Sequence, residues 1–177
     1  MASQGPLSPG TTTSPSTGFG YYTGLSNPDN MKVSDNTYAS YDTVTTNISW
    51  HVTNFGFSIP TGSTINGILF EIERKSLYSG ENITDSVVKV VKANGTPGST
   101  SKHTGTAWAL SDQYDSFGGA ADLWSETWTA EDINDADFGI FFVSYGYEVS
   151  MRIDHIRCTV YYTEGGGSAN TGFFGLM

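Results

Sequence analysis

The sequence predicts an all-β chain: a single antiparallel β-sandwich, jelly-roll or immunoglobulin-like in topology, with extended N- and C-terminal arms. Several short segments alternate apolar and polar residues, which is the pattern of half-buried strands. Turn signals rich in Gly and Pro separate these segments. Gly counts 21 and the aromatic residues are mainly Tyr and Phe, a mixture typical of turn-rich all-β chains. The length of 177 residues suits one domain.

The composition divides the chain into three parts. Residues 1–17 are almost all Gly, Pro, Ser and Thr, with Leu7 as the single Leu, and such a segment cannot form its own hydrophobic core. The end of the chain is Gly-rich and then apolar. We therefore predict an N-terminal arm at residues 1–17, a sandwich domain at residues 18–163 and a C-terminal arm at residues 164–177.

The first strands of the sandwich are predicted at residues 47–53, 64–75 and 83–92, with turns at 60–62 and 94–98. Each strand contains a set of apolar residues that share one parity, so the members of the set face the interior together. This inward-facing set comprises Ile48, Trp50, Val52, Ile68, Phe70, Ile72, Val88 and Val90. A further short strand is expected around Trp124.

One short helical turn is predicted within residues 128–138. Thr129 suits the N-cap position, and acidic residues fill the first turn, where the helix dipole favours them. The segment gathers five side chains whose oxygens suit calcium, namely Glu131, Asp132, Asn134, Asp135 and Asp137. Since the central Gly and the closing Glu of an EF-hand are missing, we expect helix capping and solvation here, and no metal site.

Two more strands are predicted after this turn. Residues 138–145 form a nearly continuous apolar run. In residues 149–162 the apolar positions change parity after Ile153. A phase change of one residue is what a β-bulge produces, so we predict a bulge at Asp154 or His155.

Charge and composition exclude several classes of protein. Acidic residues outnumber basic ones by 18 to 8, and no Lys/Arg cluster suited to nucleic acid is present. No stretch approaches the roughly 20 apolar residues of a membrane span, and residues 1–31 contain no signal-peptide core, so we expect neither membrane insertion nor a signal peptide. The Asn-x-Ser/Thr triplets at Asn47, Asn82 and Asn94 are therefore weak glycosylation signals. Cys158 is the only cysteine, which excludes a disulfide within the chain and suits a small core residue.

The sequence offers no recognisable catalytic motif. Its three histidines lie outside any nucleophile elbow, zinc-binding helix or glycine-rich phosphate loop. Asp154 and His155 form the one suggestive pair, but adjacent strand residues point to opposite faces unless a bulge reorients one of them. Glu71 and Glu73 share a strand face without any sign of a cleft between them. We expect no catalytic residue, no cofactor and no enzymatic activity.

Two pairs of tyrosines are candidates for ligand contact. Tyr21, Tyr22, Tyr145 and Tyr147 provide aromatic rings of the kind that stack on sugar rings. Aromatic residues are equally expected on half-buried strands. These tyrosines support the alternative function, which is a glycan- or receptor-binding β-sandwich module at a fibre tip.

The apolar end of the chain points to assembly. Phe173, Phe174, Leu176 and Met177 follow a Gly-rich stretch. The segment from residue 165 onward can extend about 43 Å at roughly 3.3 Å per residue, whereas a folded core of about 145 residues has a radius of gyration near 15 Å. The tail can therefore cross a neighbouring subunit, and Leu7 is the expected anchor of the N-terminal arm.

Six ordered motifs also carry a family resemblance: "PLSPGT", "SNPDNMKVSDNTYASY", "TNFGFSIPTGSTINGILFEIERK", "DSVVKVVK", "LWSETWTAEDINDADFGI" and "IDHIRCTVYYT". Over residues 5–163 the chain resembles a family of uncharacterised β-sandwich structural proteins of tailed bacteriophages and aquatic metagenomes. The resemblance implies a virion or filament component without enzymatic activity, located at the virion surface or in an extracellular filament.

Our leading hypothesis is a non-enzymatic structural protein that self-assembles through its terminal arms, or by strand exchange, into a filament or a virion-surface structure such as a fibre or decoration. The expected partners are copies of the chain itself, other virion proteins or surface glycans.

Overall fold

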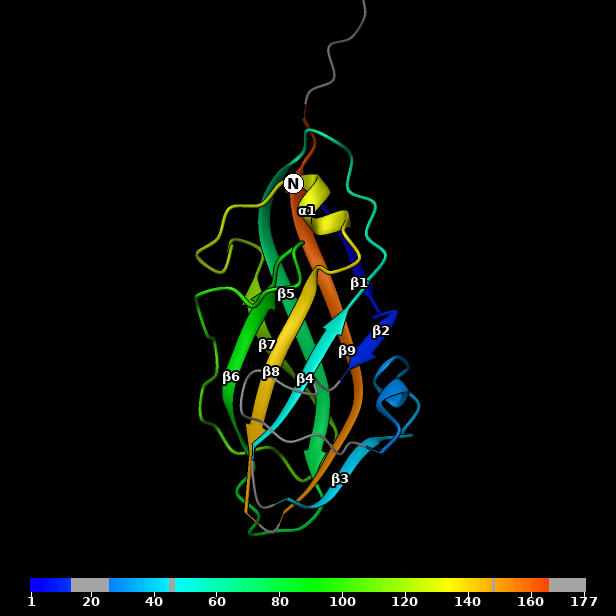
Figure 1. The fold of residues 1–177 in the computed structure, drawn as a ribbon, viewed down its shortest axis with the longest axis vertical. Helices are drawn as coiled ribbons and strands as arrows, with labels where there is room; N and C mark the ends of the chain where they lie inside the picture. The colour runs from blue at the N-terminus through cyan, green and yellow to red at the C-terminus, as the bar shows by residue number, and fades with distance from the viewer. Residues whose placement is uncertain (14–25, 45–46, 148, 166–177) are drawn as a thin grey trace, which may run out of the picture.

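The computed structural model describes residues 1–13, 26–44, 47–147 and 149–165. Two antiparallel sheets pack face to face in it, so the prediction of an all-β sandwich is confirmed (Figure 1). One sheet contains β1 (Ala2–Leu7), β3 (Ala39–Val44), β5 (Thr64–Ser76), β7 (Gln113–Gly119) and β9 (Val149–Thr163). The other contains β2 (Thr11–Thr13), β4 (Asn47–Thr53), β6 (Thr84–Val91) and β8 (Gly139–Tyr145).

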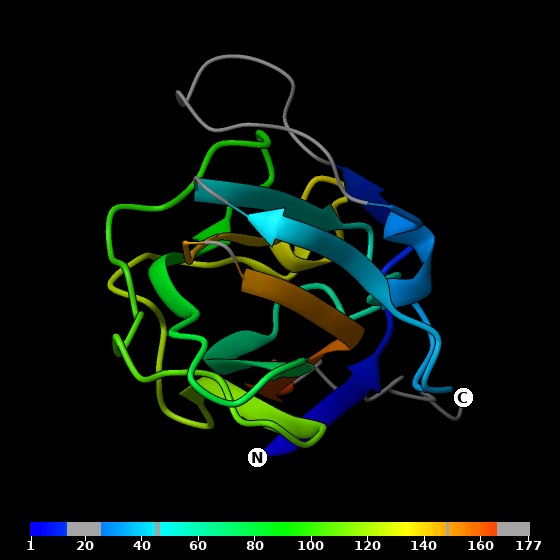
Figure 2. The same cartoon turned by 90° about the horizontal axis from the view of Figure 1, so that it is seen from below.

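The order of strands follows from two long central strands. In the five-stranded sheet the order is β1-β9-β5-β7, and β3 also pairs with β9, beyond the end of β1. In the four-stranded sheet the order is β2-β4-β8-β6. Seen from below, the two sheets form separate layers around the interior (Figure 2). The 3-10 helix η1 (Pro28–Met31) contacts β9 at one side of the sandwich.

The apolar face of each strand forms the core, as the alternation predicts. All eight residues of the predicted inward-facing set are fully buried. Trp50 stacks on Phe142 across the β4–β8 pair, with 4.6 Å between ring centroids. Phe70 contacts Phe138, the residue just before β8, with 6.0 Å between centroids. Cys158 is buried as well, so the interior is dominated by rings and branched aliphatic side chains.

The bulge in β9 is confirmed at Asp154. Glu73 of β5 pairs with His155, but the next residue, Arg74, pairs with Ile153, so Asp154 is the extra residue. The extra residue explains the change of parity. Because it shifts the alternation by one position, odd-numbered residues before the bulge and even-numbered residues after it face the same side of the sheet.

The strand expected around Trp124 is wrong. Trp124 lies in a turn with φ of 59°, and the strand of this region is β7, which ends at Gly119. The Trp124 indole is fully buried, and its Nε1 donates to the carbonyl of Ile68 at 3.1 Å. A large apolar residue thus reaches the core from a turn, while the more polar β7 forms an edge of the sheet. Burial alone does not require a strand.

The predicted helical turn is confirmed as α1 (Ala130–Asn134). The Thr129 side chain accepts a hydrogen bond from the Asp132 amide, and the Asp132 carboxylate accepts from the Thr129 amide at 2.8 Å. This reciprocal capping box satisfies two backbone donors that a helix start leaves without partners. In the part of the chain that the structure describes, no helix is long and apolar enough to span a membrane.

The first residues of the chain belong to the sandwich. β1 pairs with β9 of the same chain, and Leu7 lies opposite Cys158 and packs against the core. β2 then pairs with β4 in the other sheet. The segment expected as an arm at residues 1–17 therefore contributes one edge strand to each sheet over its described part, and the rest of it, residues 14–17, lies outside the described residues.

Candidate functional site

An open cleft lies at the end of the sandwich that points down in Figure 1. The loop at residues 77–82, which joins β5 to β6, forms one wall, and Tyr145, Tyr147 and Val149 form the other. The cleft has a volume of about 580 Å³, within the range of small-ligand sites. It is lined by Tyr78, Ser79, Gly80, Glu81, Asn82, Tyr145, Tyr147 and Val149.

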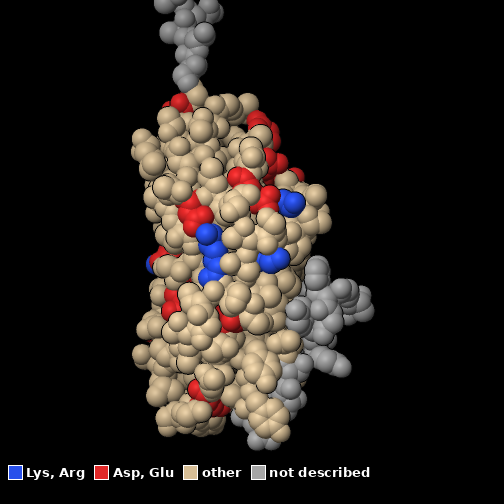
Figure 3. Space-filling model, turned by 90° about the vertical axis from the view of Figure 1, so that its left-hand side faces the viewer, with Lys and Arg blue, Asp and Glu red and all other residues tan. Residues whose placement is uncertain are grey.

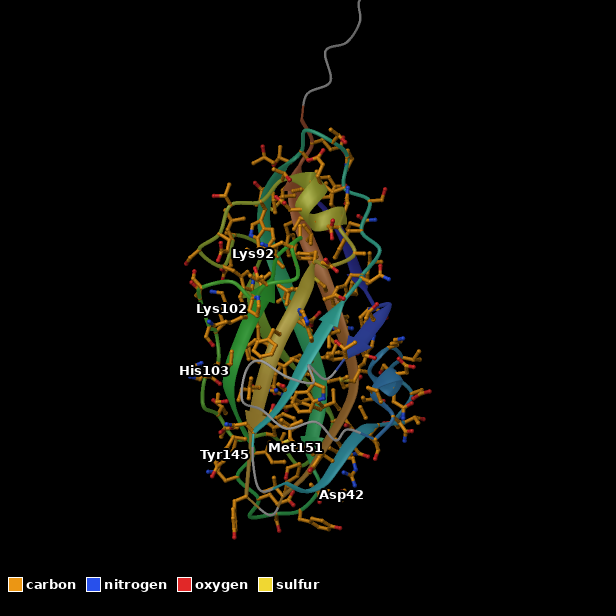
Figure 4. All side chains as sticks on the ribbon, viewed as in Figure 1. Asp42, Lys92, Lys102, His103, Tyr145 and Met151 are labelled. Carbon is orange, nitrogen blue, oxygen red and sulfur yellow. The ribbon has the colours of Figure 1, made fainter. Side chains whose placement is uncertain are left out.

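The cleft gathers exposed aromatic rings. Tyr78, Tyr145 and Tyr147 are 60%, 46% and 67% exposed, and they are all of the exposed aromatic residues in the described chain. Figure 4 shows Tyr145 at the lower end of β8. Large rings left in water at one place, while the others pack inward, mark a surface for contact with a ligand.

Glu81 fixes the loop that carries Tyr78. One carboxylate oxygen accepts from the Ser150 amide at 2.8 Å, and the other accepts from the Ser76 hydroxyl at 2.6 Å and from the Tyr78 amide at 3.2 Å. A carboxylate can only accept, so these three donors hold it against the start of β9 and the end of β5. Tyr78 is thereby presented on an ordered loop, although its ring is exposed.

Asn82 and Val149 complete the cleft. Val149 is 2% exposed and supplies an apolar base. Asn82 lines the cleft with an amide side chain, which can both donate and accept hydrogen bonds. The site thus combines aromatic faces, a small apolar floor and one amide.

The structure brings together half of the tyrosines that the sequence indicated. Tyr145 and Tyr147 lie in the cleft, whereas Tyr21 and Tyr22 lie outside the described residues. Sequence analysis missed Tyr78, whose signal is an exposed aromatic residue just before Ser79 and Gly80 in a turn. Its proximity to Tyr145 depends on the pairing of β6 with β8, which places Thr84 opposite Tyr145.

The residues predicted to mediate assembly are placed only in part. Leu7 packs inside its own sandwich. The apolar tail residues, Phe173, Phe174, Leu176 and Met177, lie outside the described residues. The described chain ends beyond β9, at the end of the sandwich opposite the tyrosine cleft (Figure 1).

The side chains of Asp154 and His155 do not bond to each other. The Asp154 carboxylate accepts from the Asp35 amide at 3.4 Å, and burial raises its pKa. The His155 ring is directed to Ser8 and Tyr114 instead. The Glu71 carboxylate binds the guanidinium of Arg157, with 2.8 Å between Nε and Oε2.

The acidic segment around α1 uses its oxygens within the protein. Asp132 belongs to the capping box, and Asp135 accepts from the Asp137 amide at 2.8 Å. The Asn134 side chain exchanges two hydrogen bonds with the backbone of Ile59. No group of three or more potential metal ligands was found in the described part of the chain.

A second hollow, of about 230 Å³, lies beside Arg74 and Phe117. Its one cationic wall is already neutralised, because Arg74 binds the carboxylates of Asp85 and Asp115. On the face shown in Figure 3, Lys and Arg side chains gather near the middle, with acidic side chains around them. Neither feature provides a free positive site for an anion.

Comparison of the chain with protein-family models, curated proteins and solved structures gave no match.

Proposed function

We propose that this β-sandwich binds carbohydrate in the tyrosine cleft. The observation that carries the proposal is the concentration of Tyr78, Tyr145 and Tyr147, the exposed aromatic residues of the described chain, around one opening. Tyr145 and Tyr147 are among the tyrosines that the sequence indicated for glycan contact. Tyr78 comes from the loop between β5 and β6.

The chemistry of the cleft suits a sugar ring. One face of a pyranose is a patch of C–H groups that packs on an aromatic face, while its hydroxyls need donors and acceptors. Tyrosine provides both an apolar ring and a hydroxyl. The Asn82 amide can donate and accept at once. Among the described residues that line the cleft, Glu81 carries the one carboxylate, and its oxygens already accept three hydrogen bonds, which suits a neutral ligand.

A glycan array followed by calorimetry tests the proposal. We expect at least one neutral glycan to bind. Tyr145→Ala or Tyr147→Ala should weaken binding by about tenfold or more, because losing one ring contact worth about 1.4 kcal/mol changes the affinity tenfold. Leu110→Ala is the matched control, since Leu110 is 56% exposed and lies outside the cleft. An array without binding, or equal affinity in the tyrosine variants, would contradict the assignment.

A second candidate function is self-assembly through the C-terminal segment. It is favoured by the direction of β9, which ends away from the tyrosine cleft and directly precedes the Gly-rich residues and their apolar end. The N-terminal segment already pairs with its own chain, so we assign the intersubunit contact to Phe173, Phe174, Leu176 and Met177. As a virion or filament component, such a subunit would present the cleft at one end and the tail at the other.

Deletion of residues 168–177 separates the two functions. We expect the truncated protein to keep its β circular dichroism spectrum and its glycan binding, but to assemble poorly in light scattering and electron microscopy. Unchanged assembly would remove the tail from the mechanism, and loss of the fold would show that the tail docks on its own subunit.

A further inference from the structure

A row of polar residues crosses the outer face of the five-stranded sheet, away from the tyrosine cleft. Glu73 of β5 lies opposite His155 of β9 on one side and opposite Tyr114 of β7 on the other. Residues opposite each other in adjacent strands share a face, about 5 Å apart. Ser8, just after β1, reaches the same row from the neighbouring edge strand.

The histidine of this row bonds at both ring nitrogens. Its Nε2 lies 2.8 Å from the Ser8 hydroxyl, and its Nδ1 lies 2.8 Å from the Tyr114 hydroxyl. The His155 residue is 8% exposed, whereas Ser8 is exposed. The tyrosine ring is itself held in place, because the Arg157 guanidinium lies 3.8 Å from its centroid.

The tautomer of His155 sets the direction of these two hydrogen bonds. With the proton on Nδ1, the ring donates to the Tyr114 hydroxyl, and Nε2 accepts from the Ser8 hydroxyl. Glu73 lies opposite both His155 and Tyr114, and the Ser34 hydroxyl donates to its Oε2 at 2.7 Å. In this tautomer the ring can remove the proton of the serine.

We propose that Ser8 is an activated nucleophile that accepts an acyl group from an activated ester, with His155 as its base. The arrangement of a nucleophile, a base within hydrogen-bond reach and a third group that orients the base is the recurring pattern of covalent catalysis. Ser8 Oγ forms a bond to the carbonyl carbon while its proton moves to His155 Nε2. The bond to the leaving oxygen then breaks, and the same proton leaves with it as the alcohol. Tyr114 acts as the positioning residue.

Burial of His155 favours the neutral ring before reaction. Burial lowers its pKa, and the nearby Arg157 acts in the same direction, while the carboxylates of Glu73 and Glu71 oppose them. A neutral imidazole is the form that can accept a proton. The carboxylates of Glu73 and Glu71 also stabilise the imidazolium that forms when the serine is deprotonated.

Acetylation by p-nitrophenyl acetate tests the proposal on the full-length protein. The first Lys or Arg is Lys32, so Ser8 and Ser3 fall in one tryptic peptide, and fragmentation of that peptide locates the acetyl group. Ser3 lies exposed on β1 and is the internal reference. We expect Ser8 to react about 100-fold faster than Ser3, in line with the contribution of a general base. The rate should rise with pH as one group with a pKa below that of free histidine loses its proton.

Variants distinguish an active serine from a structural one. His155→Gln should reduce acetylation of Ser8 to that of Ser3 while circular dichroism stays unchanged. Tyr114→Phe retains the ring over which Arg157 lies, and should slow the reaction about tenfold or more and shift its pH profile. Absence of a Ser8 adduct overturns the proposal, as does a rate and pH profile that stay the same in folded Tyr114→Phe or His155→Gln protein.

Discussion

The buried ion pair between the two sheets gives a sharp test of what holds the sandwich together. Arg74 of β5 and Asp85 of β6 meet across the interior, with side chains 3% and 2% exposed. The Asp85 oxygens accept from the two terminal guanidinium nitrogens at 2.7 and 2.6 Å. The Ser144 hydroxyl donates to Asp85 at 3.0 Å, and Asp115 accepts from Arg74 Nε at 2.9 Å.

Asp85→Ala leaves the Arg74 charge buried with one carboxylate instead of two. Removing one partner of a buried pair costs about 3–5 kcal/mol, and because Asp115 remains bound we expect about 3 kcal/mol. This lowers the melting temperature by about 6–12 °C for a chain of this size. The control is Asp42→Ala, since Asp42 is 62% exposed and its pair with Arg152 lies at the surface (Figure 4). It should cost about 1 kcal/mol or less.

Urea unfolding followed by tryptophan fluorescence measures both variants. In Arg74→Met/Asp85→Leu the charges are replaced by apolar side chains of similar volume, and stability should return close to that of the wild type. The reasoning is refuted if Asp85→Ala costs no more than Asp42→Ala, or if the double variant is less stable than Asp85→Ala.

Three further expectations follow from the same structure. Trp50→Ala and Phe142→Ala should each lower the free energy of unfolding by about 3–5 kcal/mol in urea titrations, because both rings are fully buried against each other; near-wild-type values would contradict the core assignment. Burial lowers the pKa of His155 below the free value of 6.5. The unfolded chain therefore binds the proton more readily, and stability is lost as pH falls below about 6.5. Melting curves recorded at several pH values should show a smaller loss of stability in His155→Gln. Excess chelator should leave the melting temperature unchanged, since the oxygens of residues 132–135 bond within the protein, and a calcium-dependent rise would show a metal site.

Periodicity in the sequence predicted the strands that have one buried face. The alternation of Ile48, Trp50 and Val52 and the parity change near Asp154 both appear in the structure as predicted. β7 escaped prediction because an edge strand buries little, and its residues Gln113–Gly119 are mostly polar or Gly. Trp124 misled the prediction because a single ring can reach the core from a turn.

The candidate site was predicted less completely, for a different physical reason. Tyr145 and Tyr147 stand in one segment and can be recognised together, but Tyr78 joins them only when β6 pairs with β8. Ser8 and His155 are 147 residues apart, so their contact leaves no mark in local sequence. No spacing rule connects residues that meet through strand pairing.

The sequence by itself determined the fold class, the inward-facing residues, the helix cap at Thr129 and the bulge in β9. Each of these depends on the chemistry of neighbouring residues, through side-chain alternation and local hydrogen bonds. Only the tertiary structure decided the strand order, the use of residues 2–7 as an edge strand of their own sheet, the tyrosine cleft and the partners of His155. These depend on contacts between distant segments, and many pairings of strands with similar alternation satisfy the same local pattern until the whole core is packed.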